Sequence, residues 1–286
     1  MIRTGGLKIK LKTKLDPRKF SWKKKFGSIG ELPNYDFDVI KPLETKNQEY
    51  SQICVAATVA SACEAQFGII IDELFQYAAT KKIEGSLNFN GSDPLDGCKS
   101  ATKIGCLDKK LAPYDLLSPE YNNLNKYKEE LILNAGTRKQ FSFYDVDGEK
   151  DRFDSIRASM LTSMYGNFRT PIMVGTHWRQ SWIYAKDGII TTDDSKESFT
   201  DHEFLIIGQA TKMINGKPTM CLKAHLSSGV NVGDKGCFYF PREIANKFLF
   251  ALAFGPGNSE DNKAELWNIL QKIYNYIYEL YLKLKI

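Results

Sequence analysis

Three residues in this 286-residue chain have the types and positions that nucleophilic catalysis needs: Cys54, His202 and Gln48. Cys54 opens an alanine-rich segment, and a thiol in the first turn of a helix is shifted toward the nucleophilic thiolate. His202 opens an apolar run, where a strand could hold its imidazole as general base. Gln48 lies six residues before Cys54, and its amide could fold back to stabilise an oxyanion. Together they would supply a nucleophile, a general base and an oxyanion donor.

The other five cysteines favour a simpler interpretation as core thiols. They form no C-x-x-C pair and no short cluster with histidine of the kind that binds zinc. The sequence therefore predicts no metal and no cofactor. These five residues are Cys63, Cys98, Cys106, Cys221 and Cys237.

The elements that must position the candidate residues change in kind along the chain. Helical patterns are expected over residues 51–67, 94–103 and 154–164. Strand-length apolar runs follow at 171–175, 204–208 and 220–223, and Asn215-Gly216 between the last two is a hairpin signal. Helices followed by antiparallel strands predict an α+β fold with two unlike lobes.

The order of these motifs resembles that of the papain-like cysteine peptidases. That family reads roughly K-N-Q-G-x-C-G-S-C-W-A-F around its nucleophile, and this chain has K-N-Q-E-Y-S-Q-I-C-V-A-A, ending at Ala57. Further matches cover roughly residues 31 to 250, which is more specific than any single motif. They are Leu32-Pro33, Glu64, Gly91-Ser92-Asp93-Pro94, Gly105, Pro113-Tyr114, Asp201-His202 with Gly208, and Gly229, Gly233 and Gly236.

The resemblance implies a papain-like two-lobed fold with a helical N-terminal lobe, an antiparallel β-barrel-like C-terminal lobe and an active site in the groove between them. It implies a cysteine endopeptidase with Cys54 as nucleophile, His202 as base and acid, and Gln48 as oxyanion-hole donor. Gly91 and Ser92 would line the groove and pair with the extended backbone of a protein or peptide substrate.

Two departures from the family pattern concern the histidine. The family asparagine that orients it falls on Leu226, which cannot accept the imidazole N–H, and the family tryptophan falls on Ser228. His225 or Asn231 could substitute as the orienting residue. The alternative function is accordingly a catalytically weak or inactive papain-fold assembly protein, and an isopeptidase is a third alternative that no residue selects.

The cellular location is expected to be reducing. Ser51 replaces the cysteine that the family uses in a disulfide bridge, and residues 1–14 contain no apolar core of a secretory signal. We therefore expect a cytoplasmic protein or part of a virus particle, of viral or bacterial origin, that is not secreted by a classical signal.

Charge separates the N-terminal arm from the remainder. Residues 1–30 hold eight Lys, two Arg and one Asp, whereas the remainder has more acidic than basic residues. This predicts a basic arm over 1–30 before a peptidase domain over 31–256. The arm is open to three interpretations: a solvated tail, a surface for weak nonspecific contacts with anions, or a remnant of the prosegment that family members carry.

Residues 257–286 are expected to form an amphipathic helix. Leu266, Leu270, Ile273, Ile277, Leu280 and Leu284 alternate steps of four and three, which is a heptad seam. Four acidic residues and four lysines balance over 259–286, which argues against a membrane surface. We expect self-association or docking to an assembly through this helix, and no stretch of the chain predicts a membrane span.

Overall fold

The computed structural model describes residues 21–27, 32–49, 51–87, 91–146, 151–166, 168–193 and 196–255. The predicted helix over 257–286, and with it the prediction of association, lies outside the described residues, as does most of the predicted basic arm.

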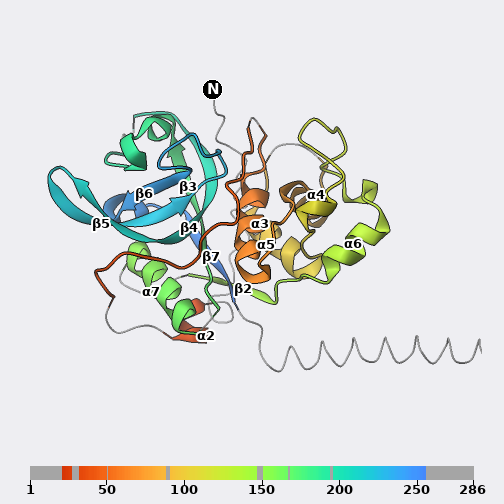
Figure 1. The fold of residues 1–286 in the computed structure, drawn as a ribbon, viewed down its shortest axis with the longest axis horizontal. Helices are drawn as coiled ribbons and strands as arrows, with labels where there is room; N and C mark the ends of the chain where they lie inside the picture. The colour runs from red at the N-terminus through yellow and green to blue at the C-terminus, as the bar shows by residue number, and fades with distance from the viewer. Residues whose placement is uncertain are drawn as a thin grey trace, which may run out of the picture. The chain divides into compact units, whose positions relative to one another are not determined.

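The helices of the first half form one side of the structure in Figure 1. α3 lies against both α4 and α5, and Gly97 of α5 lets α3 and α5 approach closely. A Cβ placed on Gly97 of α5 would lie only 2.7 Å from Val55 Cγ1 of α3. The helices are α3 (Cys54–Phe67), α4 (Glu73–Glu84), α5 (Pro94–Lys103) and α6 (Glu129–Gly136).

The N-termini of these helices differ in whether a side chain caps them. Asp72 caps α4 and Asp93 caps α5, each by accepting backbone N–H groups of the first turn. Ile53 at the start of α3 offers no such side chain. The first N–H groups of α3 are therefore not capped by the residue that precedes Cys54.

An antiparallel sheet of seven strands forms the other side of the structure (Figure 1), in the order β2-β7-β3-β4-β5-β6 with β1 paired to β4. Asn215 and Gly216 both have positive φ angles, of 51° and 75°, as a two-residue hairpin requires, and join β4 to β5. The predicted α+β class is thus confirmed. The strands are β1 (Phe37–Asp38), β2 (Ser142–Asp145), β3 (Ile172–Arg179), β4 (Phe199–Ile214), β5 (Lys217–His225), β6 (Cys237–Pro241) and β7 (Phe250–Gly255).

Two further helices accompany the sheet, α7 (Arg152–Tyr165) and α8 (Arg242–Ala245). Short 3-10 turns occupy Lys109–Leu111, Leu124–Lys126, Gln180–Tyr184 and Lys186–Gly188. None of the helices in the described ranges is long and apolar enough to cross a lipid bilayer.

The two faces of β4 pack against different clusters. Phe204 and Ile206 belong to an aromatic-rich cluster within the sheet lobe, which we call the core face of β4. Leu205 and Ile207 belong to the cluster that contains Cys54 of α3, which we call the helix face. Because side chains alternate along a strand, neighbouring residues of β4 face different lobes.

The N-terminal boundary needs a correction. The sequence predicts a basic arm through residue 30, but α2 (Trp22–Phe26) is part of the packed domain. Trp22 is fully buried, and its ring lies 6.2 Å from Tyr144 and 5.8 Å from Phe168. Burial of this aromatic surface outweighs the cost of placing three lysines beside it, since their charged ends can remain in water.

Candidate active site

Cys54 is the first residue of α3 and is completely buried. Burial and then the nearby Glu203 carboxyl raise the pKa of its thiol well above the ordinary value, and backbone N–H groups of Glu203 and Val55 that bond to the sulfur lower it by less. In this arrangement the thiol is neutral, so it needs a base before it can act as a nucleophile.

His202 lies on β4, opposite Thr176 of β3, and is also completely buried. Its ring meets the edge of Trp178, with centroids 5.6 Å apart and planes at 73°. Neither ring nitrogen has a hydrogen-bond partner in the described part of the chain. Burial lowers the pKa of His202 to about 3, so the imidazole is neutral at physiological pH.

Cys54 and His202 are therefore neighbours through the backbone but are not hydrogen-bonded to each other among the described residues. The thiol contacts the N–H of Glu203, the residue after His202. The cause is the alternation of β4, because Glu203 lies on the helix face while the His202 ring lies with Trp178 and Phe204 on the core face.

Gln48 is held in a loop that pairs with residues 227–229. Its backbone N–H donates to Ser227 O at 2.9 Å, and Ser227 Oγ donates to Gln48 Oε1 at 2.6 Å. The side-chain Nε2 donates to Ser51 O at 3.1 Å. An amide nitrogen has two N–H groups, so this bond leaves one for an oxyanion.

A buried ammonium group anchors the same loop. Lys46 Nζ lies 2.8 Å from Glu64 Oε1, 3.2 Å from Glu73 and 3.2 Å from Glu44. Burial would lower the pKa of Lys46, but the carboxylates of Glu73 and Glu64 outweigh it and raise that pKa. The charge network ties the loop that carries Gln48 to the helix that carries Cys54.

Gly91 and Ser92 are placed by α4. Gly91 has a φ of +49°, which favours glycine, and its carbonyl accepts a bond from Lys81 Nζ. The Asp93 N–H donates to Glu84 Oε1 at 2.8 Å. Ser92 is fully buried, and its Oγ has no hydrogen-bond partner in the described ranges.

The candidate orienting residues lie elsewhere. His225 Nε2 bonds Thr45 Oγ1 at 3.0 Å, Asn231 is exposed, and Leu226 is buried in the apolar core of the sheet lobe. Since both nitrogens of His202 lack partners in the described part of the chain, none of the three orients it in this structure. The ring of Trp178 is the contact that positions His202, and the sequence carried no signal for it beyond an aromatic residue in a strand.

A second imidazole on the helix face was also missed. His177 of β3 and Asp201 of β4 are partners in register, with Nδ1 and Oδ1 2.7 Å apart. Both are partly exposed. This pair has the carboxylate contact that His202 lacks, on the face of β4 that carries Glu203.

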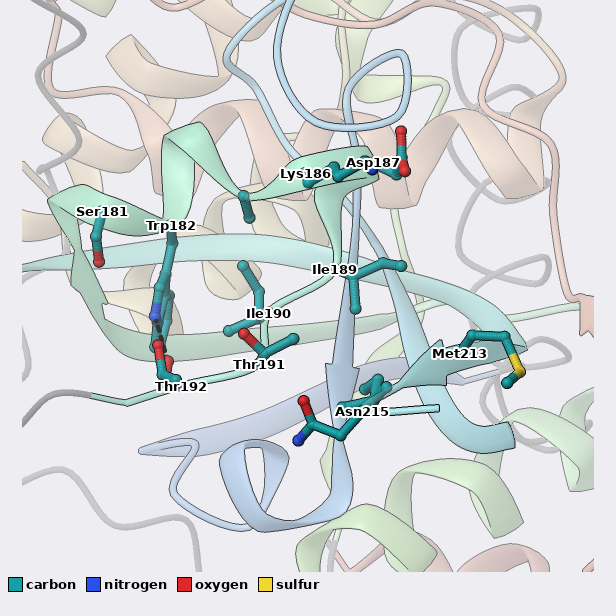
Figure 2. A pocket seen from close by; sticks show the side chains of 12 residues that line it. Ser181, Trp182, Lys186, Asp187, Ile189, Ile190, Thr191, Thr192, Met213 and Asn215 are labelled. Atoms are coloured by element: carbon teal, nitrogen blue, oxygen red, sulfur yellow. Dashed lines mark hydrogen bonds between the residues drawn. The ribbon is translucent and has the colours of Figure 1, made fainter. Parts of the chain in front are cut away.

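All six cysteines are free thiols, and no group of three metal-binding side chains occurs within the residues that the structure describes. A hollow of about 450 Å³ lies in the sheet lobe. Trp182, Ile190 and Asn215 are among the residues that line it (Figure 2). None of the candidate residues lines it.

Comparison with solved structures defines the class of this fold. Xylellain, a cysteine protease from Xylella fastidiosa, is similar with a TM-score of 0.71 and 20% identity, over 90% of this chain and 99% of that one. ProCathepsin B S9 from Trypanosoma congolense gives 0.66 and 17% identity over 89% and 87% of the two chains. The bromelain protease from Ananas comosus, in complex with the E64 inhibitor, gives 0.54 and 16% over 77% and 98%.

The chain therefore has the fold of the papain-like C1 cysteine proteases, as the sequence motifs predict. No protein-family model and no curated protein sequence matches the chain. At these identities the similarity establishes the fold, and the chemistry has to be argued from the residues of this chain.

Proposed function

We propose that this chain is a cysteine peptidase that hydrolyses peptide bonds with Cys54 as nucleophile, His202 as general base and Gln48 as oxyanion-hole donor. The observation that carries the proposal is the hydrogen bond from the backbone N–H after His202 to a thiol at the start of α3, within a papain-like fold. That contact brings the strand of the histidine to the cysteine.

The proposed reaction needs no cofactor. His202 takes the thiol proton, the thiolate attacks the peptide carbonyl, and Gln48 donates a hydrogen bond to the oxyanion. The C–N bond breaks as the imidazolium returns its proton to the leaving amine. Water then attacks the thioester with His202 as base, which releases the carboxylic acid and restores the thiol.

One movement is required before the first step. The His202 ring must leave its edge contact with Trp178 and turn toward Cys54, because the two groups are neutral and unpaired as described. A thiolate–imidazolium pair would then stabilise both charges, and it would reverse the effects of burial on the two pKa values.

The second candidate is a catalytically weak or inactive papain-fold protein that binds partners through residues 257–286. Leu226 at the family asparagine position favours it, and so does the imidazole of His202, which has no hydrogen-bond partner among the residues that the structure describes. Such a protein would have the papain-like fold but would not form a thiolate at Cys54.

Alkylation with iodoacetamide at mildly acidic pH, mapped by mass spectrometry, separates the two candidates. A peptidase is expected to be modified first at Cys54, because only a thiolate paired with imidazolium persists at that pH. His202→Ala should remove this preference, and His225→Ala, which alters a histidine bonded to Thr45, should keep it. Equal and slow labelling of all six cysteines would contradict the peptidase.

A further inference from the structure

Glu203 places a buried carboxyl group next to the proposed nucleophile. Its backbone N–H bonds to the Cys54 sulfur, and its side chain is 1% exposed. It lies on the helix face of β4, since Leu205 on that face packs with Cys54. The carboxyl thus projects toward the start of α3.

The surroundings of this carboxyl contain no compensating cation among the described residues. Its Oε2 has no hydrogen-bond partner there, and no lysine, arginine or histidine forms an ion pair with it within the described ranges. The charged side chain that acts on it is Asp93, which has the same sign. Burial and then Asp93 raise the pKa of Glu203 well above the ordinary value.

Buried carboxyl groups in proteins are normally paired or hydrogen-bonded, because an unpaired one is costly. Ser92, beside Asp93 in the chain, has a second buried oxygen without a partner in the described part of the chain. A buried carboxyl oxygen and a buried hydroxyl without partners are what a binding site for a polar ligand leaves behind.

The strand beside Glu203 offers no side chain as a partner for the carboxyl. Gly175 of β3 is its partner in register, so no side chain stands opposite the carboxyl on that strand. Asp201 lies two residues along β4 on the same face, about 7 Å away along the strand, and adds negative charge.

We propose that Glu203 forms a cation-selective subsite beside Cys54, which selects substrates with a lysine or arginine side chain close to the scissile bond. A cationic side chain would pair with Glu203 Oε2, and its positive charge would offset the effect of that carboxyl on the Cys54 thiol. The inference rests on the proposed peptidase function for its substrate class.

A test that does not require catalysis uses two thiol reagents of opposite charge. Trimethylammonioethyl and sulfonatoethyl methanethiosulfonate are reacted with the full-length chain, and the modification rate of Cys54 is followed by mass spectrometry. We expect the cationic reagent to be favoured about tenfold at Cys54, which corresponds to about 1.4 kcal/mol. Glu203→Gln should remove most of that preference, whereas the ratio at Cys237 should stay the same.

If the ratio of the two modification rates at Cys54 were equal in the wild type and in Glu203→Gln, the proposed subsite would be wrong. It would also be wrong if the cationic reagent failed to modify Cys54. Peptides with arginine or its neutral analogue citrulline at each position near the scissile bond provide the second readout. Glu203→Gln should narrow the difference in kcat/KM between the two peptides. Absence of hydrolysis of every peptide would count against the peptidase, while the reagent ratio tests the subsite separately.

Discussion

The two faces of β4 hold the site's ionisable groups in opposite kinds of surroundings. On the core face, His202 is completely buried against Trp178 and has no polar partner within the described residues. On the helix face, Asp201 pairs with His177 and Glu203 adjoins Cys54. One residue step along a strand thus separates an apolar environment from a charged one.

The difference between the two faces of β4 shows that motif spacing does not determine where a side chain points. A spacing places a residue on an element, whereas the pairing of β3 with β4 and the packing of aromatic rings decide where its side chain points. The catalysis that we propose for Cys54 and His202 therefore requires a change of side-chain conformation from the described state.

The largest expected effect distinguishes the two imidazoles. His202→Ala should lower kcat/KM by about 100- to 10,000-fold, because it removes the proposed general base, and His177→Ala should lower it by less than about tenfold. Steady-state hydrolysis of a peptide library by the two variants measures this. The reverse order would place the base on the helix face instead.

The core face depends on Trp178. Trp178→Ala should lower the free energy of unfolding by about 3–5 kcal/mol, since it removes a fully buried ring that packs against His202, Phe238 and Phe240. Urea denaturation measures the loss. Tyr184→Ala, which removes an exposed aromatic residue, is the control and should change stability little. A small loss in Trp178→Ala would mean that the core face is not packed as described.

The two faces should also respond to pH with opposite signs. The pKa of His202 falls to about 3 on folding, so the unfolded chain binds its proton first and stability is lost as pH drops below 6.5, by about 3 kcal/mol at pH 4. The pKa of Glu203 rises on folding, so its stabilising contribution is present below the unfolded pKa and is lost as pH rises.

Unfolding free energies between pH 4 and pH 8 test this contrast. His202→Phe should reduce the loss at acidic pH, and Glu203→Gln should reduce the loss toward alkaline pH. If either variant had the pH dependence of the wild type, the corresponding side chain would not be buried as described.

The smallest effect belongs to the partly exposed pair. Asp201→Asn should change the free energy of unfolding by less than about 1 kcal/mol, because solvent screens the contact between His177 and Asp201. Urea denaturation at pH 6 measures it. A loss of several kcal/mol in the free energy of unfolding would show that the contact between His177 and Asp201 is as shielded from solvent as the core face.

The sequence predicted those parts of the fold that have strong local signals. The helix at Pro94–Lys103 was predicted with its observed bounds from the proline in its first turn, and the hairpin at Asn215-Gly216 was recognised from its residue types. Helix α4 was not predicted, although the cap Asp72 and apolar residues at helical spacing after it are helix signals. β7 and β2 were missed because their pairing is nonlocal.

Within the site, the sequence placed Cys54 at the start of its helix but could not orient His202. Its ring direction depends on Trp178 in another strand, and that contact arises only when β3 and β4 pair. The role of Glu203 was hidden for the same reason, because a glutamate in an apolar run is normally assigned to an exposed position.

The most direct test of the central claim is to trap the acyl-enzyme. The full chain is mixed with an activated ester or a chromogenic peptide substrate, quenched in acid and analysed by intact and peptide mass spectrometry. We expect a burst of product and one acyl group on Cys54, absent in Cys54→Ser and strongly reduced in His202→Ala. Substrate turnover with no acyl group on Cys54, or with the same yield in His202→Ala, would contradict the central claim.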